Sequence, residues 1–271
     1  MELQNKKVQL LIVNYGNWDM TLESVKTFIN QNISIVIIDN YKNDLNENDE
    51  NIIKIIKALG VAVKRYDRNL GYLGAPISFL KENNSYDWTI ISNNDIYLKK
   101  GDIYNSIKII ESDSEVIAIA PSIKELESRE LNPYFKHRIS FFRKIIFNIY
   151  YSNFYLAKII MKARKTILAD KIETSEYNQY VYGLNGAFMI LQKKLIKEII
   201  KEGLISFLYG EEILIAETVD KMKKKIFFTD KIELYHEHGV TTGKTFSKQK
   251  FDWMKQAYVQ SKKKGYNFYK I

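Results

Sequence analysis

The sequence contains no cysteine, so it forms no disulfide bond and offers no thiolate for catalysis. No apolar run reaches the roughly 18 uncharged residues that a membrane-spanning helix requires. Residues 1–7 are polar, and the apolar run 8–13 is too short for the core of a signal peptide. There is also no internal repeat and no low-complexity linker. These absences favour a cytoplasmic location for the chain.

Acidic residues are missing from one long segment. Between Leu131 and Ala169 there is no Asp or Glu, whereas the same segment holds basic residues at Lys136, Arg138, Arg143, Lys144, Lys158, Lys162, Arg164 and Lys165. The net charge of the whole chain is +9, and this segment accounts for nearly all of that excess. A chain made basic by one segment indicates a single surface for an anionic partner.

Apolar runs alternate with stretches of helical length along the first half of the chain. Buried strands are expected at residues 8–13, 33–38, 61–64 and 88–91, and the second helix between them should begin near residue 51. This alternation predicts an α/β fold with a doubly wound, mostly parallel central sheet. Later strands are expected at 116–120, ended by Pro121, around 182–191, at 226–228 and at 232–234.

We expect one continuous domain in three parts. They are a first α/β half at residues 1–121, a basic, aromatic helical insertion at 122–180, and a second half at 181–271 that ends in a helix at 248–264.

Polar residues follow each expected strand of the first half. They are Asn14 and Tyr15, Asp39 and Asn40, Arg68 and Asn69, and Asn93, Asn94 and Asp95. Ligands of open α/β sheets bind beyond the carboxyl ends of the strands, so we expect these side chains where a nucleotide would sit. A carboxylate between amides is a hard oxygen cluster that suits Mg²⁺ or Mn²⁺ with a phosphate ligand. The alternative is an Asx-rich turn that caps the next helix.

Seven short motifs follow one another along the chain. They are Ile12-Val13-Asn14-Tyr15 with Trp18 and Thr21; Ile37-Ile38-Asp39-Asn40; Asn69-Leu70-Gly71-Tyr72 with Gly74; Asn93-Asn94-Asp95; Asn185-Gly186-Ala187-Phe188-Met189; Phe207-Leu208-Tyr209-Gly210-Glu211-Glu212; and His236-Glu237-His238. In this order they resemble the family 2 glycosyltransferases, which have the GT-A fold. The chain departs from the family at Glu212, where Asp is usual, and at Asn93, a neutral first position of the metal motif. Segment 131–169 matches no motif.

The resemblance implies transfer of a sugar, with inversion, from a nucleoside-diphosphate sugar of the UDP or dTDP type to a hydroxyl. Residues 1–121 would then be the nucleotide-sugar-binding half, and residues 181–271 the acceptor-binding and catalytic half. Asp95 with Asn93 would hold Mn²⁺ or Mg²⁺, and His236 or His238 would complete the metal sphere; the alternative for each His is a loop or packing role. Glu212 is the expected general base. Glu211 is the second choice, and the alternative is that both residues only complement the helix dipole.

The other motif residues are expected around the donor. Asp39 would accept hydrogen bonds from the base or ribose, and Asn14 and Tyr15 would line the base pocket. Arg68 would meet a phosphate or be a solvated loop charge. Two loop glycines would let the backbone approach the ligand or turn tightly, namely Gly71 and Gly74. The predicted donor site is completed by Asn40, Asn69, Asn94 and Gly186.

Segment 134–165 interleaves aromatic and basic side chains. A cationic amphipathic pattern of this kind is typical of peripheral contact with a membrane, here the inner face of the plasma membrane. The alternative is a helical lobe that packs on the core or on a second subunit, as in a homodimer. No nucleic-acid partner is expected, because the sequence holds no recognised nucleic-acid-binding motif.

We therefore predict a metal-dependent glycosyltransferase of surface polysaccharide synthesis, with a glycan or a lipid-linked saccharide as acceptor. One alternative is a sugar-phosphate nucleotidyltransferase, for which Asn14-Tyr15-Gly16-Asn17 is a poor glycine-rich phosphate loop. The other is a catalytically eroded, membrane-docked protein that binds nucleotide sugars.

Overall fold

The computed structural model describes residues 7–41, 43–125, 129–138, 141–167, 176–203, 207–237 and 247–263. Its elements in the first half are β1 (Val8–Asn14), α1 (Trp18–Phe28), β2 (Ser34–Asp39), α2 (Glu47–Ala58), β3 (Ala62–Arg65), α3 (Gly74–Glu82) and β4 (Trp88–Asn93). Strand β1 pairs in parallel with both β2 and β4, and β2 pairs in parallel with β3. The predicted parallel half of the sheet is therefore confirmed.

The second half adds strands to the same sheet. Its elements are β5 (Ile96–Lys100), α4 (Ile103–Ile110), β6 (Val116–Lys124), β7 (Gln179–Val181), β8 (Phe188–Gln192), α7 (Lys193–Glu202), α8 (Glu211–Lys221) and β9 (Lys225–His236). The strands in the described part of the chain run in the order β3-β2-β1-β4-β8-β6-β9-β5, and β7 pairs with β9. Strand β8 is antiparallel to both of its neighbours, β4 and β6.

Four differences from the sequence-based expectation concern β5, β6, β9 and α2. Strand β5 was not predicted. Strand β6 does not end at Pro121 but continues to Lys124, with a register shift next to the proline, a position where a missing N–H is tolerated. The two short strands expected at 226–228 and 232–234 are one strand, β9, whose polar centre lies opposite that shift. Helix α2 also begins earlier than expected, because Asn46 and Asp49 form a capping box.

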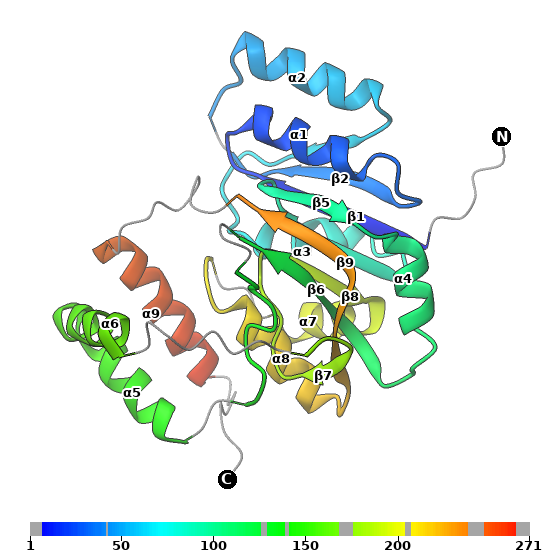
Figure 1. Cartoon of the computed structure of the whole chain (residues 1–271). Coiled ribbons are helices and arrows are strands. Elements are labelled where there is room, and N and C mark those ends of the chain that lie inside the picture. Colours follow the sequence, from blue (N-terminus) through cyan, green and yellow to red (C-terminus); the bar gives the residue numbers. More distant parts are fainter. Residues whose placement is uncertain are drawn as a thin grey trace.

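Two apolar layers cover the two faces of the sheet (Figure 1). In β1, Leu10 and Ile12 face the cluster that includes side chains of α1, α2 and α4. Leu11 and Val13 face the opposite cluster, which includes side chains of α3, α7 and α8. This alternation follows from the two-residue period of a strand, and it explains why β1 is buried at every position.

A small helical lobe lies beside the sheet (Figure 1). It consists of α5 (Phe141–Ser152), α6 (Phe154–Ile167) and the C-terminal helix α9 (Lys248–Lys263), around a core of Tyr150, Ala157 and Phe251. The Tyr151 ring stacks on Tyr258 at 4.6 Å between centroids. Among the described helices, none is both long enough and apolar enough to span a bilayer.

Candidate active site

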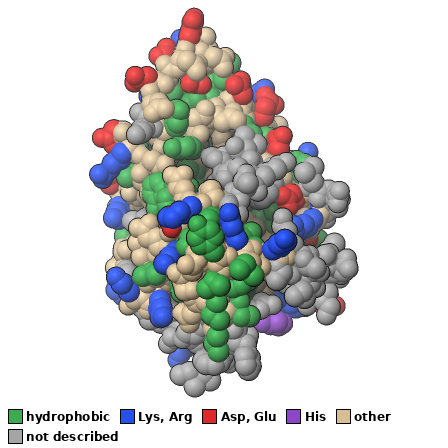
Figure 2. Space-filling view, turned by 90° about the vertical axis from the view of Figure 1, so that its left-hand side faces the viewer, with side chains coloured by type: hydrophobic (Ala, Val, Ile, Leu, Met, Phe, Trp, Pro, Cys, Tyr) green, Lys and Arg blue, Asp and Glu red, His purple; other side chains and the backbone are tan. Residues whose placement is uncertain are grey.

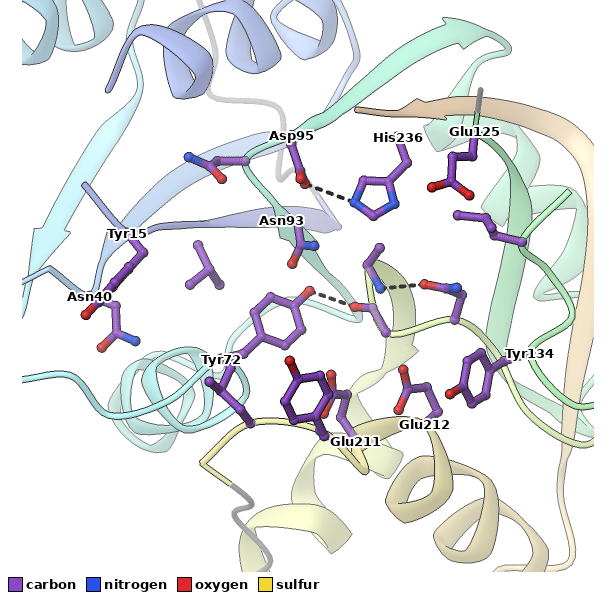
Figure 3. A pocket seen from close by; sticks show the side chains of 18 of the residues that line it. Tyr15, Asn40, Tyr72, Asn93, Asp95, Glu125, Tyr134, Glu211, Glu212 and His236 are labelled. Carbon is purple, nitrogen blue, oxygen red and sulfur yellow. Dashed lines mark hydrogen bonds and ion pairs between the residues drawn. The ribbon is translucent and has the colours of Figure 1, made fainter. Parts of the chain in front are cut away.

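A pocket of about 430 Å³ opens at the carboxyl ends of β1 and β4 (Figure 3). Ten of the predicted site residues line it: Tyr15, Asn40, Asn69, Asn93, Asn94, Asp95, Gly186, Glu211, Glu212 and His236. Five others are described but are not part of its lining: Asn14, Asp39, Arg68, Gly71 and Gly74. His238 lies outside the described residues.

Asp95 and His236 meet on one wall of this pocket. Strand β5 begins directly after Asp95, and its first residue, Ile96, pairs with His236 on β9. This pairing brings Oδ1 of Asp95 to 3.2 Å from Nε2 of His236, with each side chain only 7% exposed. The unpredicted strand β5 is therefore the element that joins the two predicted metal ligands.

The chemistry of this pair fits a divalent cation. Oδ1 of Asp95 is buried and makes no hydrogen bond within the described chain, so its close contact with His236 is not a well-formed hydrogen bond. A carboxylate oxygen beside an imidazole nitrogen is a suitable donor pair for Mn²⁺. Among the described residues, no three His, Cys, Asp or Glu side chains form a full ligand set. Further donors would thus be the Asn93 amide, water and ligand oxygens.

The opposite wall is formed by the first turn of α8. The chain reaches this turn through two left-handed residues, Tyr209 (φ 67°) and Gly210 (φ 86°). Glu211 and Glu212 then point into the pocket, as Figure 3 shows. Gly186 leaves room for them, because a Cβ at that position would lie 2.9 Å from Oε1 of each carboxylate.

The two carboxyl groups differ in their protonation. Burial, and then the charge of Glu212, raise the pKa of Glu211 well above its ordinary value of 4.5. Burial also raises the pKa of Glu212, but backbone hydrogen bonds, including one from Gly186, oppose that shift. Both carboxyl groups therefore favour the protonated form more than exposed ones do, and the stronger shift is at Glu211.

Tyr72 lines the pocket and forms a long-range hydrogen bond there. Its hydroxyl donates a 2.7 Å hydrogen bond to the Gly186 carbonyl. Burial raises the pKa of Tyr72 well above 10, and the neighbouring carboxylates add to that shift, so the hydroxyl keeps its proton. The sequence motif included Tyr72, but its bond to a residue 114 positions away could not be read from the motif.

Asn14 and Asp39 belong to a buried network behind the pocket. Nδ2 of Asn14 donates to Asp39, and Oδ1 of Asn14 accepts from Thr21 and Asn94. Oδ2 of Asp39 accepts a 2.8 Å bond from Arg65. Both Asn14 and Asp39 are fully buried, so they are placed to support the wall rather than to line it. Burial is the main cause that raises the pKa of Asp39.

The loop after β3 is held by Asn40. The side-chain amide of Asn40 bonds to Asn69, the Leu70 N–H and the Gly71 carbonyl. Gly71 has φ 83°, which fits the expected tight turn, and a Cβ there would lie 2.1 Å from the Phe207 carbonyl oxygen, so glycine also allows packing against the segment before α8. Arg68 is exposed and is not part of the pocket lining, which fits the expected alternative of a solvated loop charge. Arg65 pairs with Asp39.

Four residues after β6 line the pocket without having been predicted, namely Glu125, Arg129, Leu131 and Tyr134. Figure 3 places Glu125 next to His236 and Tyr134 next to Glu212. They belong to the segment in which the α/β rhythm of the sequence is lost, so no local pattern pointed to them. Among the described lining residues, Arg129 is the one Lys or Arg side chain.

Comparison with known proteins identifies similar folds but no similar sequences. No protein-family model matches the sequence, and no curated protein matches it. GalNAc-T7, in a crystal structure with UDP, GalNAc and Mn²⁺, aligns over 96% of this chain and 49% of its own, with 15% identity and a TM-score of 0.61. The Pyrobaculum calidifontis mannosyltransferase PcManGT, with GDP-Man and Mn²⁺, aligns over 93% and 69%, with 10% identity and a TM-score of 0.54.

The S. aureus protein TarS aligns over 85% of this chain and 36% of its own, with 10% identity and a TM-score of 0.53. This chain thus spans about half the length of the GalNAc-T7 chain and about a third of TarS. The three neighbours are glycosyltransferases. The similarity confirms the predicted mixed α/β, GT-A-like fold with a mostly parallel central sheet.

Proposed function

We propose that this protein is an inverting, metal-dependent glycosyltransferase of the family 2 type, which transfers a sugar from a nucleoside-diphosphate sugar to a hydroxyl. One observation carries the proposal. A single pocket in a glycosyltransferase-like fold has Asp95 and His236 on one wall and the Glu211–Glu212 pair on the other (Figure 3). This is the arrangement needed to hold a leaving diphosphate opposite a general base.

The donor would lie along the β1–β4 edge. Tyr15 is 43% exposed, and its ring packs edge-on against Tyr41 at 5.2 Å, so it offers a face for the nucleotide base. Asp95, His236 and Asn93 would hold Mn²⁺ or Mg²⁺. When bound, the cation neutralises charge that develops on the diphosphate. Arg129 is placed to add a second positive charge.

The transfer step would be a single displacement. Glu212 accepts the proton of the acceptor hydroxyl as that oxygen bonds to the anomeric carbon. The bond between this carbon and the diphosphate oxygen breaks at the same time, and the nucleoside diphosphate leaves with the bonding electrons. Glu211 retains its proton, so only one negative charge faces the forming oxocarbenium-like centre. Inversion follows because only one displacement occurs.

The remaining assignments rest on the resemblance of the sequence motifs to the family 2 glycosyltransferases. The donor is of the UDP or dTDP type, and the acceptor is a glycan or lipid-linked saccharide used in surface polysaccharide synthesis at the cytoplasmic side of the membrane. Two neighbouring structures contain UDP with GalNAc and GDP-Man, so donors of both base types belong in any test.

A thermal-shift panel of UDP-, dTDP- and GDP-sugars with Mn²⁺ tests the proposal. Binding to the folded state stabilises it by about 2.7 kcal/mol at a ligand concentration of 100 Kd. We expect one donor class to raise the melting temperature of the wild type, and chelation of Mn²⁺ to remove most of that rise. Asp95→Asn should lose the Mn²⁺-dependent part, whereas the matched variant Asp87→Asn, at an exposed position, should keep it.

Transfer itself is measured as release of nucleoside diphosphate together with glycosylated acceptor. A wild type that binds none of the donors would overturn the proposal. Release of pyrophosphate from a nucleoside triphosphate and a sugar phosphate would instead support the nucleotidyltransferase alternative.

A further inference from the structure

The outward faces of α5 and α6 carry large apolar side chains in solvent. They are Ile145, Ile146 and Ile149 on α5, and Tyr155, Leu156 and Ile159 on α6; we call these six residues the apolar face. Tyr155 is 71% exposed and Ile159 is 65% exposed. Their spacing of three and four residues places them on one side of each helix. Exposure of several large aliphatic groups together is unusual for a surface that only meets water.

The apolar face is not needed to build the lobe. Other positions of the same helices supply Tyr150 and Ala157 to the lobe core, where Phe251 of α9 closes it. Tyr258 of α9 also donates a 2.7 Å hydrogen bond to Asn148 of α5. The lobe is thus already packed from within, and the apolar face remains available to a partner.

Positively charged side chains lie beside the apolar face. Lys158 and Lys162 are exposed on α6, and residues 131–169 contain no acid. Figure 2 shows apolar side chains gathered low on this side of the molecule with Lys and Arg around them, while most acidic side chains lie at the upper end. An apolar centre with a basic rim complements a lipid leaflet with anionic headgroups.

The same lobe borders the Glu212 side of the pocket. Trp253 of α9 packs on Phe207 at 5.8 Å between ring centroids, and Nζ of Lys250 lies 5.6 Å above the Tyr209 ring. The negative charge of Glu212 also contributes to the raised pKa of Tyr151, although burial is the larger cause. A surface bound at the lobe therefore lies near the wall that would receive the acceptor.

We propose that the apolar face and the basic rim of Lys158 and Lys162 dock this protein on an anionic lipid leaflet, with the Glu212 wall turned toward a lipid-carried acceptor. Only the last clause rests on the proposed function. A second copy of the chain is the weaker occupant, because a two-fold contact through this face would bring the basic rims of both copies together. Anionic headgroups neutralise that rim instead.

Sedimentation with vesicles tests the docking. The probes are vesicles of equimolar phosphatidylcholine and phosphatidylglycerol, compared with vesicles of phosphatidylcholine alone. The wild type should bind the anionic vesicles, and binding should weaken as salt rises. Ile146→Glu combined with Ile159→Glu should weaken binding by about a hundredfold, since each buried aliphatic group contributes roughly tenfold or more. The matched control is Ile109→Glu on α4, which is also exposed at 57% and should bind like the wild type.

The basic rim is tested separately. Lys158→Glu with Lys162→Glu should weaken binding at least about 25-fold, because each lysine near an anionic leaflet contributes roughly fivefold. The same reversal at Lys54 and Lys57, exposed on α2, is the control and should change binding little. Donor-induced thermal shifts should be unchanged in all four variants, which separates failure of docking from failure of the proposed function.

Two results would overturn the docking proposal. One is vesicle binding that is absent in the wild type or unaffected by the apolar and lysine variants. The other is a dimer in solution, seen by light scattering, that Ile146→Glu with Ile159→Glu dissociates while vesicles remain unbound; the apolar face would then be a subunit interface.

Discussion

Buried polar groups on the two walls of the pocket differ in whether they have partners. Behind the β1–β4 wall, Asn14 is fully buried, and its side chain uses both its donor and its acceptor within a network of protein groups. On the α8 wall, Glu211 is buried and Glu212 is half-buried beside it, and among the described residues no ion pair joins either carboxylate to a cation. The first wall is stabilised by its polar groups, whereas the second is held at a free-energy cost.

This contrast separates scaffold from reactive group. A satisfied network such as that of Asn14 fixes the ends of β1, α1 and β4, and it has little capacity left for a ligand. Two adjacent carboxyl groups whose pKa values are raised by burial are suited to take up and release a proton. Glu217 shows the difference within α8 itself, because this buried Glu is paired with Arg138 at 2.7 Å.

The largest expected effect is on catalysis at the α8 wall. Glu212→Gln keeps the shape of the side chain but removes the base, so kcat for sugar transfer should fall by on the order of 10³. The KM for the donor should change little, because the donor would bind on the other wall. Glu50→Gln, at an exposed acid of α2, is the control. Full activity in Glu212→Gln would transfer the role of base to another residue.

The next largest effect is on the free energy of unfolding, through the network behind the β1–β4 wall. Asn14→Ala removes the partner of Asp39, Thr21 and Asn94 at once, so the free energy of unfolding should fall by about 2 kcal/mol or more. Urea denaturation measures this loss, with Asn51→Ala, at an exposed position of α2, as the control. A change below about 0.5 kcal/mol would contradict the scaffold role, because that is the range of ordinary surface substitutions.

The sequence predicted the first half of the fold well because its signals are local. Strands β1, β2 and β4 are continuous apolar runs that end at polar residues, a pattern typical of buried parallel strands. Strand β5 was missed because it is an edge strand that ends in Lys99 and Lys100 and depends on pairing with β9, some 140 residues later. Strand β9 was split in two because Thr229, Asp230 and Lys231 resemble a turn.

The candidate site was predicted in part for a similar reason. Positions at strand ends, such as Asp95, can be placed from a parallel sheet, and a resemblance of motifs added Glu211, Glu212 and His236. Whether a strand-end side chain lines the pocket or is buried behind it depends on its partners. Asp39 is covered because Arg65 and Asn14 reach it, and neither contact follows from sequence spacing.

The smallest expected effect is on the pH dependence of folding stability, which reflects the free-energy cost of placing Glu211 and Glu212 side by side. The pKa of Glu211 is raised in the folded state, so the folded protein binds more protons than the unfolded one between pH 4.5 and that raised pKa. Stability therefore falls as pH rises through this window. Glu211→Gln stays neutral and avoids the loss, so it should exceed the wild type by about 1 kcal/mol above neutral pH and match it below pH 4.5.

Denaturation across a pH series measures this difference, and Glu217→Gln provides the contrast within the same helix. Burial raises the pKa of Glu217 too, but Tyr182 and Arg138 oppose that shift by bonding to its carboxylate. Gln breaks both contacts, so Glu217→Gln should lower stability where Glu211→Gln raises it. If both variants lower stability alike at every pH, then Glu211 is a stabilised structural group, and the α8 wall is no different in kind from the wall of Asn14.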